Sequence, residues 1–173
     1  MERKNKTFVQ NPNIDYLFGM FGTKPIPTKQ DKFVPADVIQ INDDGTEEEL
    51  KIFYTKKPDA DAVLEFTNEL RNVASKVFKE GKRINKPHLV EVLISISVTE
   101  RRFKQVDIDN LTKCVLDALN TVAFEDDSQV SSIIANKHVH DMKVHAIMIG
   151  ITKLTKERQG FGSEIKLFRE KES

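Results

Sequence analysis

Two segments of the chain carry apolar residues at helical spacing. The first covers residues 58–79, with a proline at its start and Gly81 just after its end, where helices commonly stop. The second follows Asp107, and the residues of its apolar face are Leu111, Val115, Ala118, Leu119 and Val122. These patterns predict two helices, each with one face turned towards a core.

Other segments show the shorter repeat of strands. Residues 89–98 alternate between apolar and mostly polar positions, which predicts a strand with one well-buried face. Further strands are predicted over residues 37–41, 49–54, 130–135 and 144–152. Turn formers at 42–45 predict a hairpin between the first two, and residues 136–141 predict another between the last two. The expected fold is α/β (α+β), a mixed sheet with two main helices packed on it.

The chain divides into three parts. Residues 36–152 hold the predicted helices and strands and form the expected main domain. Residues 1–35 mix prolines and glycines with the aromatic run 16–21, and we expect an irregular extension that packs somewhere. Residues 153–173 are strongly charged, with apolar positions for one further short element.

Composition limits the class of protein. The chain has 173 residues, 39% of them hydrophobic and 31% charged, which is typical of one soluble domain. It contains neither an apolar run near the length of a membrane span nor a signal-type core, so we expect a cytoplasmic protein without membrane contact. Its single cysteine, Cys114, lies inside a predicted helix and is expected to be a packed thiol.

Residues 107–137 hold an unusual density of carboxylates. Asp109, Lys113 and Asp117 are four residues apart, so they share one face of the predicted helix, away from its apolar face. Asp107 precedes the helix, where an extended backbone would place it on the same side as Asp109.

A second acidic cluster, Glu125-Asp126-Asp127, comes just before the strand predicted over 130–135. A turn after the helix would bring this cluster back towards the first. Carboxylates converging with a lysine are what a Mg²⁺-dependent phosphoryl-transfer site needs, because this cation takes oxygen ligands and the lysine offsets phosphate charge.

Each of these residues also has a structural alternative. Asp107 or Asp109 would suit the N-terminus of a helix, and residues 126–128 would suit a polar turn. Three histidines suggest zinc, but their spacing places no fourth ligand, and we do not expect a zinc site at His138, His140 and His145.

The order D-x-D-N-L-x-K, then D-A-L, then D-D-S-Q-V, ending in a strand lysine, resembles the RusA family of Holliday junction resolvases over residues 89–150. The resemblance implies a small homodimeric endonuclease of phage or prophage origin that cuts four-way DNA junctions with one or two Mg²⁺ ions. It also implies that Asp107, Asp109 and Asp127 are the essential carboxylates and that Lys113 is the catalytic lysine. Asp126, as a further metal ligand, and Lys137 fall on other matching positions.

The zero formal charge argues mildly against nucleic acid, but the cations are clustered. Two basic runs flank the acidic segment and are predicted to contact DNA together with Lys137; they comprise Lys82, Arg83 and Lys86, and Arg101, Arg102 and Lys104. The expected activity is therefore a Mg²⁺-dependent, structure-specific DNA endonuclease of recombination and repair. Two alternatives remain: an inactive relative that only binds branched DNA, and a metal-dependent phosphoesterase with a smaller substrate.

A homodimer is expected because paired cuts in a two-fold symmetric junction need two sites, and each chain provides one. The aromatic run 16–21 and the outer face of the strand at 89–98 are candidates for its interface, and a sheet edge is a third.

Overall fold

The computed structural model describes residues 8–30, 32–79 and 81–165, with the side chains of 49–52 left out. A mixed four-stranded sheet forms the centre of the molecule. Its strands lie in the order β1 (Tyr16–Phe21), β6 (Ala146–Lys153), β4 (Val90–Ser97) and β5 (Val130–His138). β4 runs parallel to β5, and the other two pairs are antiparallel.

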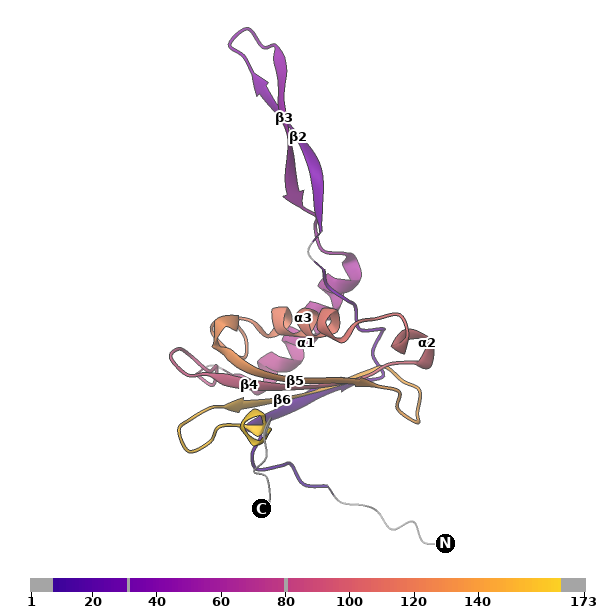
Figure 1. The fold of residues 1–173 in the computed structure, drawn as a ribbon, viewed down its shortest axis with the longest axis vertical. Helices are drawn as coiled ribbons and strands as arrows, with labels where there is room; N and C mark the ends of the chain where they lie inside the picture. Colours follow the sequence, from indigo (N-terminus) through magenta and orange to yellow (C-terminus); the bar gives the residue numbers. More distant parts are fainter. Residues whose placement is uncertain (1–7, 31, 80, 166–173) are drawn as a thin grey trace, which may run out of the picture.

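Two helices, α1 (Asp61–Val77) and α3 (Ile108–Leu119), pack on one face of the sheet (Figure 1). A third, α2 (Glu100–Phe103), is a single short turn that contains Arg101 and Arg102 of the second basic run. Apolar residues from both long helices and from β1, β4 and β6 form one buried cluster, and the partly buried Val130 and Ala135 of β5 pack against it. The predicted α+β class is confirmed. Within the described ranges no helix is both long and apolar enough to cross a bilayer.

Helix α1 begins later than the sequence pattern suggests. It starts at Asp61, and Ala60 before it has an extended backbone, so Pro58 lies outside the helix. The reason is local pairing: the Lys57 amide donates to the Lys32 carbonyl at 2.7 Å, which prolongs the preceding strand pair towards the helix.

The prediction of a hairpin at residues 136–141 is wrong. β5 and β6 do not pair with each other, because β4 lies between them and bonds to both. β4 is mostly buried along its length, as a central strand should be. Alternation of apolar residues marks a strand but carries no information about its neighbour.

The sequence predicted an irregular N-terminal extension. The segment instead contributes a strand, β1, which pairs with β6 at the edge of the sheet. Tyr16 and Phe18 turn towards the helices, and their rings lie 4.4 and 5.9 Å from that of Phe78. Gly19 allows β1 to approach β6 closely, because a side chain there would collide with the Ile147 carbonyl. Tyr16 and Phe18 of the aromatic run therefore pack on the core, whereas Leu17 and Phe21 are exposed.

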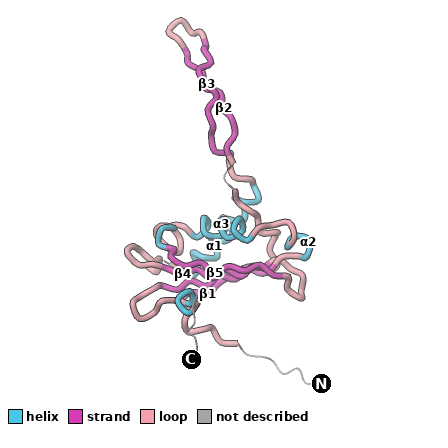
Figure 2. The backbone as a smooth tube through the Cα atoms, in the orientation of Figure 1, coloured by secondary structure: helices cyan, strands magenta, loops and turns pink. Residues whose placement is uncertain are grey.

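The hairpin predicted around residues 42–45 is present and longer than expected. Its strands are β2 (Phe33–Ile41) and β3 (Glu47–Lys56), which pair antiparallel along their length with one irregularity after Val38. Figures 1 and 2 show this two-stranded ribbon, here called the arm, standing clear of the sheet and helices.

The C-terminal segment contains the one short element expected, the 3-10 turn η2 (Phe161–Glu164). It is attached to the fully buried side chain of Glu91 on β4, whose carboxylate oxygens accept from the amides of Phe161 and Gly162, both at 2.7 Å. The apolar positions predicted at 167 and 168 lie outside the described residues.

Candidate active site

A cavity of about 610 Å³ lies between α3 and the start of β5. Its walls combine polar residues of the helix with one aspartate and several apolar residues from the strand side. The lining residues are Ile108, Asp109, Thr112, Lys113, Leu116, Asp117, Asp127, Val130, Ile133 and Ala135. Residues of both acidic clusters therefore line one cavity, with Asp109 coming from α3 and Asp127 from the segment just before β5.

The amphipathic pattern of α3 produces this arrangement. Leu111, Val115 and Leu119 of its apolar face are fully buried against the core. The line Asp109, Lys113 and Asp117 is four residues apart and must emerge on another side of the helix. That side faces the cavity, as the sequence predicted.

Asp107 occupies the N-cap position of α3, but its side chain forms no capping hydrogen bond. Its backbone is extended, with φ −91° and ψ 142°, and its side chain is exposed. The capping alternative therefore does not account for this carboxylate. The cavity lining begins one residue later, at Ile108.

Asp126 does act as a cap. One of its oxygens accepts from the Ser128 amide at 2.8 Å, and the other lies 3.3 Å from Lys86 Nζ. The bonds from Ser128, assisted by Lys86, lower the pKa of Asp126 to about 2. Asp126 thus begins the 3-10 turn η1 (Asp127–Gln129), and this turn presents the following residue, Asp127, to the cavity.

Gln129 holds the acidic turn in place from behind. Its buried side chain accepts from the amides of Glu125 and Asp126 at 2.9 and 3.0 Å. Its amide nitrogen donates to the carbonyls of Ile84 and His88 at 3.2 and 2.7 Å. One side chain therefore connects the acidic turn to the loop that leads into β4.

Asp117 lies on the cavity wall but has a cationic partner. Lys29 Nζ is 2.9 Å from Asp117 and 3.0 Å from Asp59. Partial burial alone would lower the pKa of Lys29, but its bonds to both carboxylates outweigh burial and raise it. Lys29 thus joins both ends of the arm to α3 beside the site.

Lys137, predicted to contact DNA, holds the loop before α3. Its ammonium donates to the carbonyls of Phe103, at 2.9 Å, and Val106, and lies 4.7 Å from the centre of the Phe103 ring. Val106 directly precedes Asp107. This contact fixes the end of β5 to the loop that leads into α3.

The other residues predicted to contact DNA differ in exposure and in what they already bind. Arg101 and Lys104 are exposed next to α3, and Lys82 and Arg83 are exposed before β4. Arg102 differs, because its guanidinium bonds to the Ile26 carbonyl and burial lowers its pKa. Lys86 is adjacent to the acidic turn through Asp126.

Nowhere in the described part of the chain do three or more His, Cys, Asp or Glu side chains lie close enough to hold a metal ion together. The predicted trio Asp107, Asp109 and Asp127 is thus not assembled as a closed cage. The donors nonetheless fit Mg²⁺, which commonly takes one or two carboxylates and completes its shell with water and substrate phosphate. Asp109 and Asp127, facing one open cavity, are such a pair.

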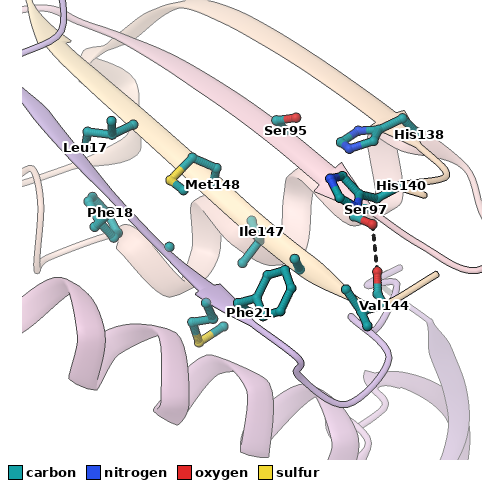
Figure 3. A pocket seen from close by; sticks show the side chains of 13 residues that line it. Leu17, Phe18, Phe21, Ser95, Ser97, His138, His140, Val144, Ile147 and Met148 are labelled. Carbon is teal, nitrogen blue, oxygen red and sulfur yellow. Dashed lines mark hydrogen bonds between the residues drawn. The ribbon is translucent and has the colours of Figure 1, made fainter. Parts of the chain in front are cut away.

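A second cavity, of about 500 Å³, lies on the other side of the sheet, along β1 and β6 (Figure 3). Apolar residues such as Leu17 and Met148 dominate its lining, with His138 and His140 at one end. The rings of these two histidines are 6.4 Å apart. Among the described residues that line this cavity there is no carboxylate, lysine or arginine, the groups that hold a hard cation or a phosphate.

Two residues that shape the site were missed by sequence reasoning. Gln129 had a local signal, because Asp126-x-x-Gln129 is a capping-box spacing. Lys29 had none: its partner Asp117 is 88 positions further along the chain and meets it only in the folded molecule.

The family model of endodeoxyribonuclease RusA matches residues 24–152, which is most of the chain and includes the whole cavity lining. No curated protein matches the chain.

Proposed function

The chain belongs to the RusA endodeoxyribonuclease family, and from this premise we propose that it is a structure-specific endonuclease that resolves Holliday junctions or related branched DNA in recombination and repair. The observation that supports the proposal is the cavity lined by Asp109 and Lys113 of α3 and by Asp127 of η1. It lies inside the region matched by the family model.

We propose that Asp109 and Asp127 hold Mg²⁺, with Asp107 as an additional ligand from the start of α3. A bound Mg²⁺ would polarise the scissile phosphate and make a bound water more acidic. Asp126 is a weaker candidate for this role, because both of its oxygens already have partners in Ser128 and Lys86.

Lys113 is proposed to face the scissile phosphate. It stands one helical turn from Asp109 on the same wall. Its positive charge would offset the negative charge that grows on the phosphate oxygens as the phosphodiester is attacked. This contribution is largest in the transition state, so it increases the rate more than the affinity.

The exposed cations beside the cavity are proposed to bind DNA phosphates. Arg101 and Lys104 lie on one side of the site, and Lys82, Arg83 and Lys86 lie near the acidic turn. Such contacts position the backbone without reading sequence. They suit a substrate recognised by shape.

A homodimer is part of the proposal. Resolution of a junction requires two cuts in strands of like polarity, and each chain supplies one cavity of this kind. An isologous pair supplies two sites related by a two-fold axis, matching the symmetry of the junction.

The test is cleavage of a labelled four-way junction beside a linear duplex of the same arm sequence, with Mg²⁺ and with EDTA. The expected result is cutting of the junction only, and only with Mg²⁺. Binding without cutting under any divalent cation would indicate an inactive DNA-binding relative. Equal turnover of a small phosphodiester would indicate a general phosphoesterase.

A further inference from the structure

The cavity between α3 and β5 has two kinds of lining. Asp109, Lys113 and Asp127 supply charge, and the proposed function assigns them to metal and phosphate. A second part of the lining is apolar and is here called the apolar floor; it consists of Leu116 of α3 and of Val130, Ile133 and Ala135 of β5. Neither Mg²⁺ nor a phosphate is stabilised by such a surface, because both need polar partners. The proposed chemistry therefore leaves the apolar floor without a role.

Sheet geometry explains why the apolar floor is accessible. Ile133 pairs with the fully buried Val92 of β4, so both side chains lie on the face of the sheet that carries the helices. β5 is an edge strand, and α3 leaves part of it uncovered, so that Ile133 is 48% exposed. A single half-exposed isoleucine is ordinary on a protein surface. This one is informative because it lines a cavity together with other apolar side chains and with carboxylates.

Two further polar residues of the lining are already engaged within the protein. The Thr112 hydroxyl donates to the Ile108 carbonyl at 2.7 Å, and Asp117 lies 2.9 Å from Lys29 Nζ. Apart from Asp109, Lys113 and Asp127, the cavity therefore offers a ligand mainly apolar contact.

The part of DNA that suits such a surface is the nucleobase. A base that leaves the helical stack presents flat faces of low polarity, which apolar side chains can contact. In an intact duplex these faces are stacked in the interior and cannot reach a cavity on a protein surface. At a branch point stacking is interrupted, and extrusion of a base costs least where the base is already unpaired. The apolar floor thus matches an unstacked base of branched DNA.

We propose that the apolar floor is a subsite for one unstacked nucleobase next to the scissile phosphate, with Ile133 as its main contact. The subsite rests on the proposed function, since it shares a cavity with the residues assigned to metal and phosphate. A base bound there holds its own phosphate close to Asp109 and Lys113. A paired duplex offers no such base, so the subsite favours branched DNA over duplex.

A change in the protein combined with a change in the DNA tests the subsite. Ile133→Thr keeps the branched shape that suits a strand and removes apolar surface. In the DNA, an abasic site replaces each in turn of the two nucleotides that flank the cut made by the wild type. Ile133→Thr alone, and one of the two abasic sites alone, should each reduce kcat/KM for junction cleavage at least about fivefold. Together they should reduce it no further, because both remove the same contact.

Two variants control for other effects of the substitution. Ile133→Leu keeps the apolar surface and should cut the unmodified junction within about twofold of wild type. Leu64→Ala is the matched control, because Leu64 of α1 is 50% exposed and lies outside the cavity lining; its effect should be small and equal on both junctions. Ile133→Ala truncates the same side chain differently and should repeat the result of Ile133→Thr. Melting temperatures should stay near wild type because Ile133 is half exposed.

Three results would overturn the base subsite. The first is two losses that multiply when they are combined. The second is a defect of Ile133→Thr with no effect of either abasic site, which would assign the apolar floor to the sugar backbone. The third is a changed mass of Ile133→Thr in light scattering, which would assign the apolar floor to a contact between subunits. Each leaves the proposed function standing if the wild type cuts junctions, whereas a wild type that cuts none removes both.

Discussion

The aspartates around the cavity differ in what their carboxylates already bind. Asp117 is paired with Lys29, and Asp126 with Ser128 and Lys86. Asp109 and Asp127 face the cavity, and Asp107 makes no capping bond. Carboxylates that hold the fold together and carboxylates proposed to hold a metal are therefore separate residues, although they are near neighbours in sequence.

This difference predicts the ranking of substitutions. Asp109→Asn and Asp127→Asn should each reduce junction cleavage by several orders of magnitude, because the amide keeps the shape but removes the charge that binds Mg²⁺. Asp107→Asn should behave in the same way. Junction binding, measured by mobility shift, should be unchanged or tighter because repulsion of phosphate is relieved.

Asp126→Asn is the matched control, since it removes the same charge from the adjacent position. An amide oxygen still accepts from Ser128, so cleavage should stay within about tenfold of wild type. Near wild-type cleavage by the Asp109 or Asp127 variant would exclude that residue from the metal site.

A substitution of Lys137 can distinguish two roles for this residue: bracing the loop before α3 through its bonds to the Phe103 and Val106 carbonyls, or contacting DNA phosphate. Lys137→Met removes the bonds to the Phe103 and Val106 carbonyls, and should lower the free energy of unfolding by about 1–2 kcal/mol. Cleavage should fall by up to about 10²-fold, because small displacements of catalytic groups are costly.

The salt dependence of junction binding should not change in this variant. A phosphate contact would instead flatten the plot of log affinity against log salt by about one unit. Hydrogen exchange at the amides of residues 104–110 should become faster if the loop is released. A flattened slope with unchanged exchange would contradict the bracing role.

At the scale of elements, the segment between β4 and α3 combines two kinds of basic residue. Arg101 in α2 and Lys104 just after it are exposed. Arg102, in contrast, is bonded to the Ile26 carbonyl of the N-terminal segment. The short helix therefore has one side attached to the body and another available to a polyanion. Basic residues that are consecutive in sequence therefore do not all lie on one exposed surface.

Neutralising Arg101 and Lys104 together should weaken junction binding and flatten its salt dependence by about two units, one for each lost phosphate contact. Thermal stability should be almost unchanged because both side chains are exposed. Arg102→Gln is the comparison: it should lower the melting temperature and leave the salt slope near wild type. An unchanged slope in the double variant would show that this loop does not touch DNA.

At the scale of the whole molecule, the features are arranged on different sides. The helices and the cavity proposed as the active site share one face of the sheet, and the arm projects from that side (Figure 1). The apolar cavity in Figure 3 lies on the opposite face.

The proposed homodimer predicts paired incisions. Wild-type protein should convert a plasmid with an extruded cruciform to linear DNA, because both strands are cut in one encounter. Mixed dimers of wild type and the Asp109→Asn variant hold one active site, so they should leave nicked circles. Linear product in unchanged yield from the mixture, at equal total wild-type protein, would contradict coordinated cutting by two subunits.

Much of the local structure follows from sequence by itself. Apolar spacing identified both long helices and the strands of the main domain, and it placed Asp109, Lys113 and Asp117 on a side of α3 away from the core. The turn at 42–45 identified the hairpin. These properties are local, because helix and strand periodicities are set by neighbouring residues of one segment.

Tertiary structure decided the rest. Only the fold puts β4 between β5 and β6, adds β1 to the sheet, and joins Lys29 to Asp117. It also assigns Lys137 to two carbonyls and Asp126 to a cap. Periodicity shows which face of a segment is buried but not what covers it. The partners lie tens of residues away, and packing and charge select them only when the whole chain is assembled.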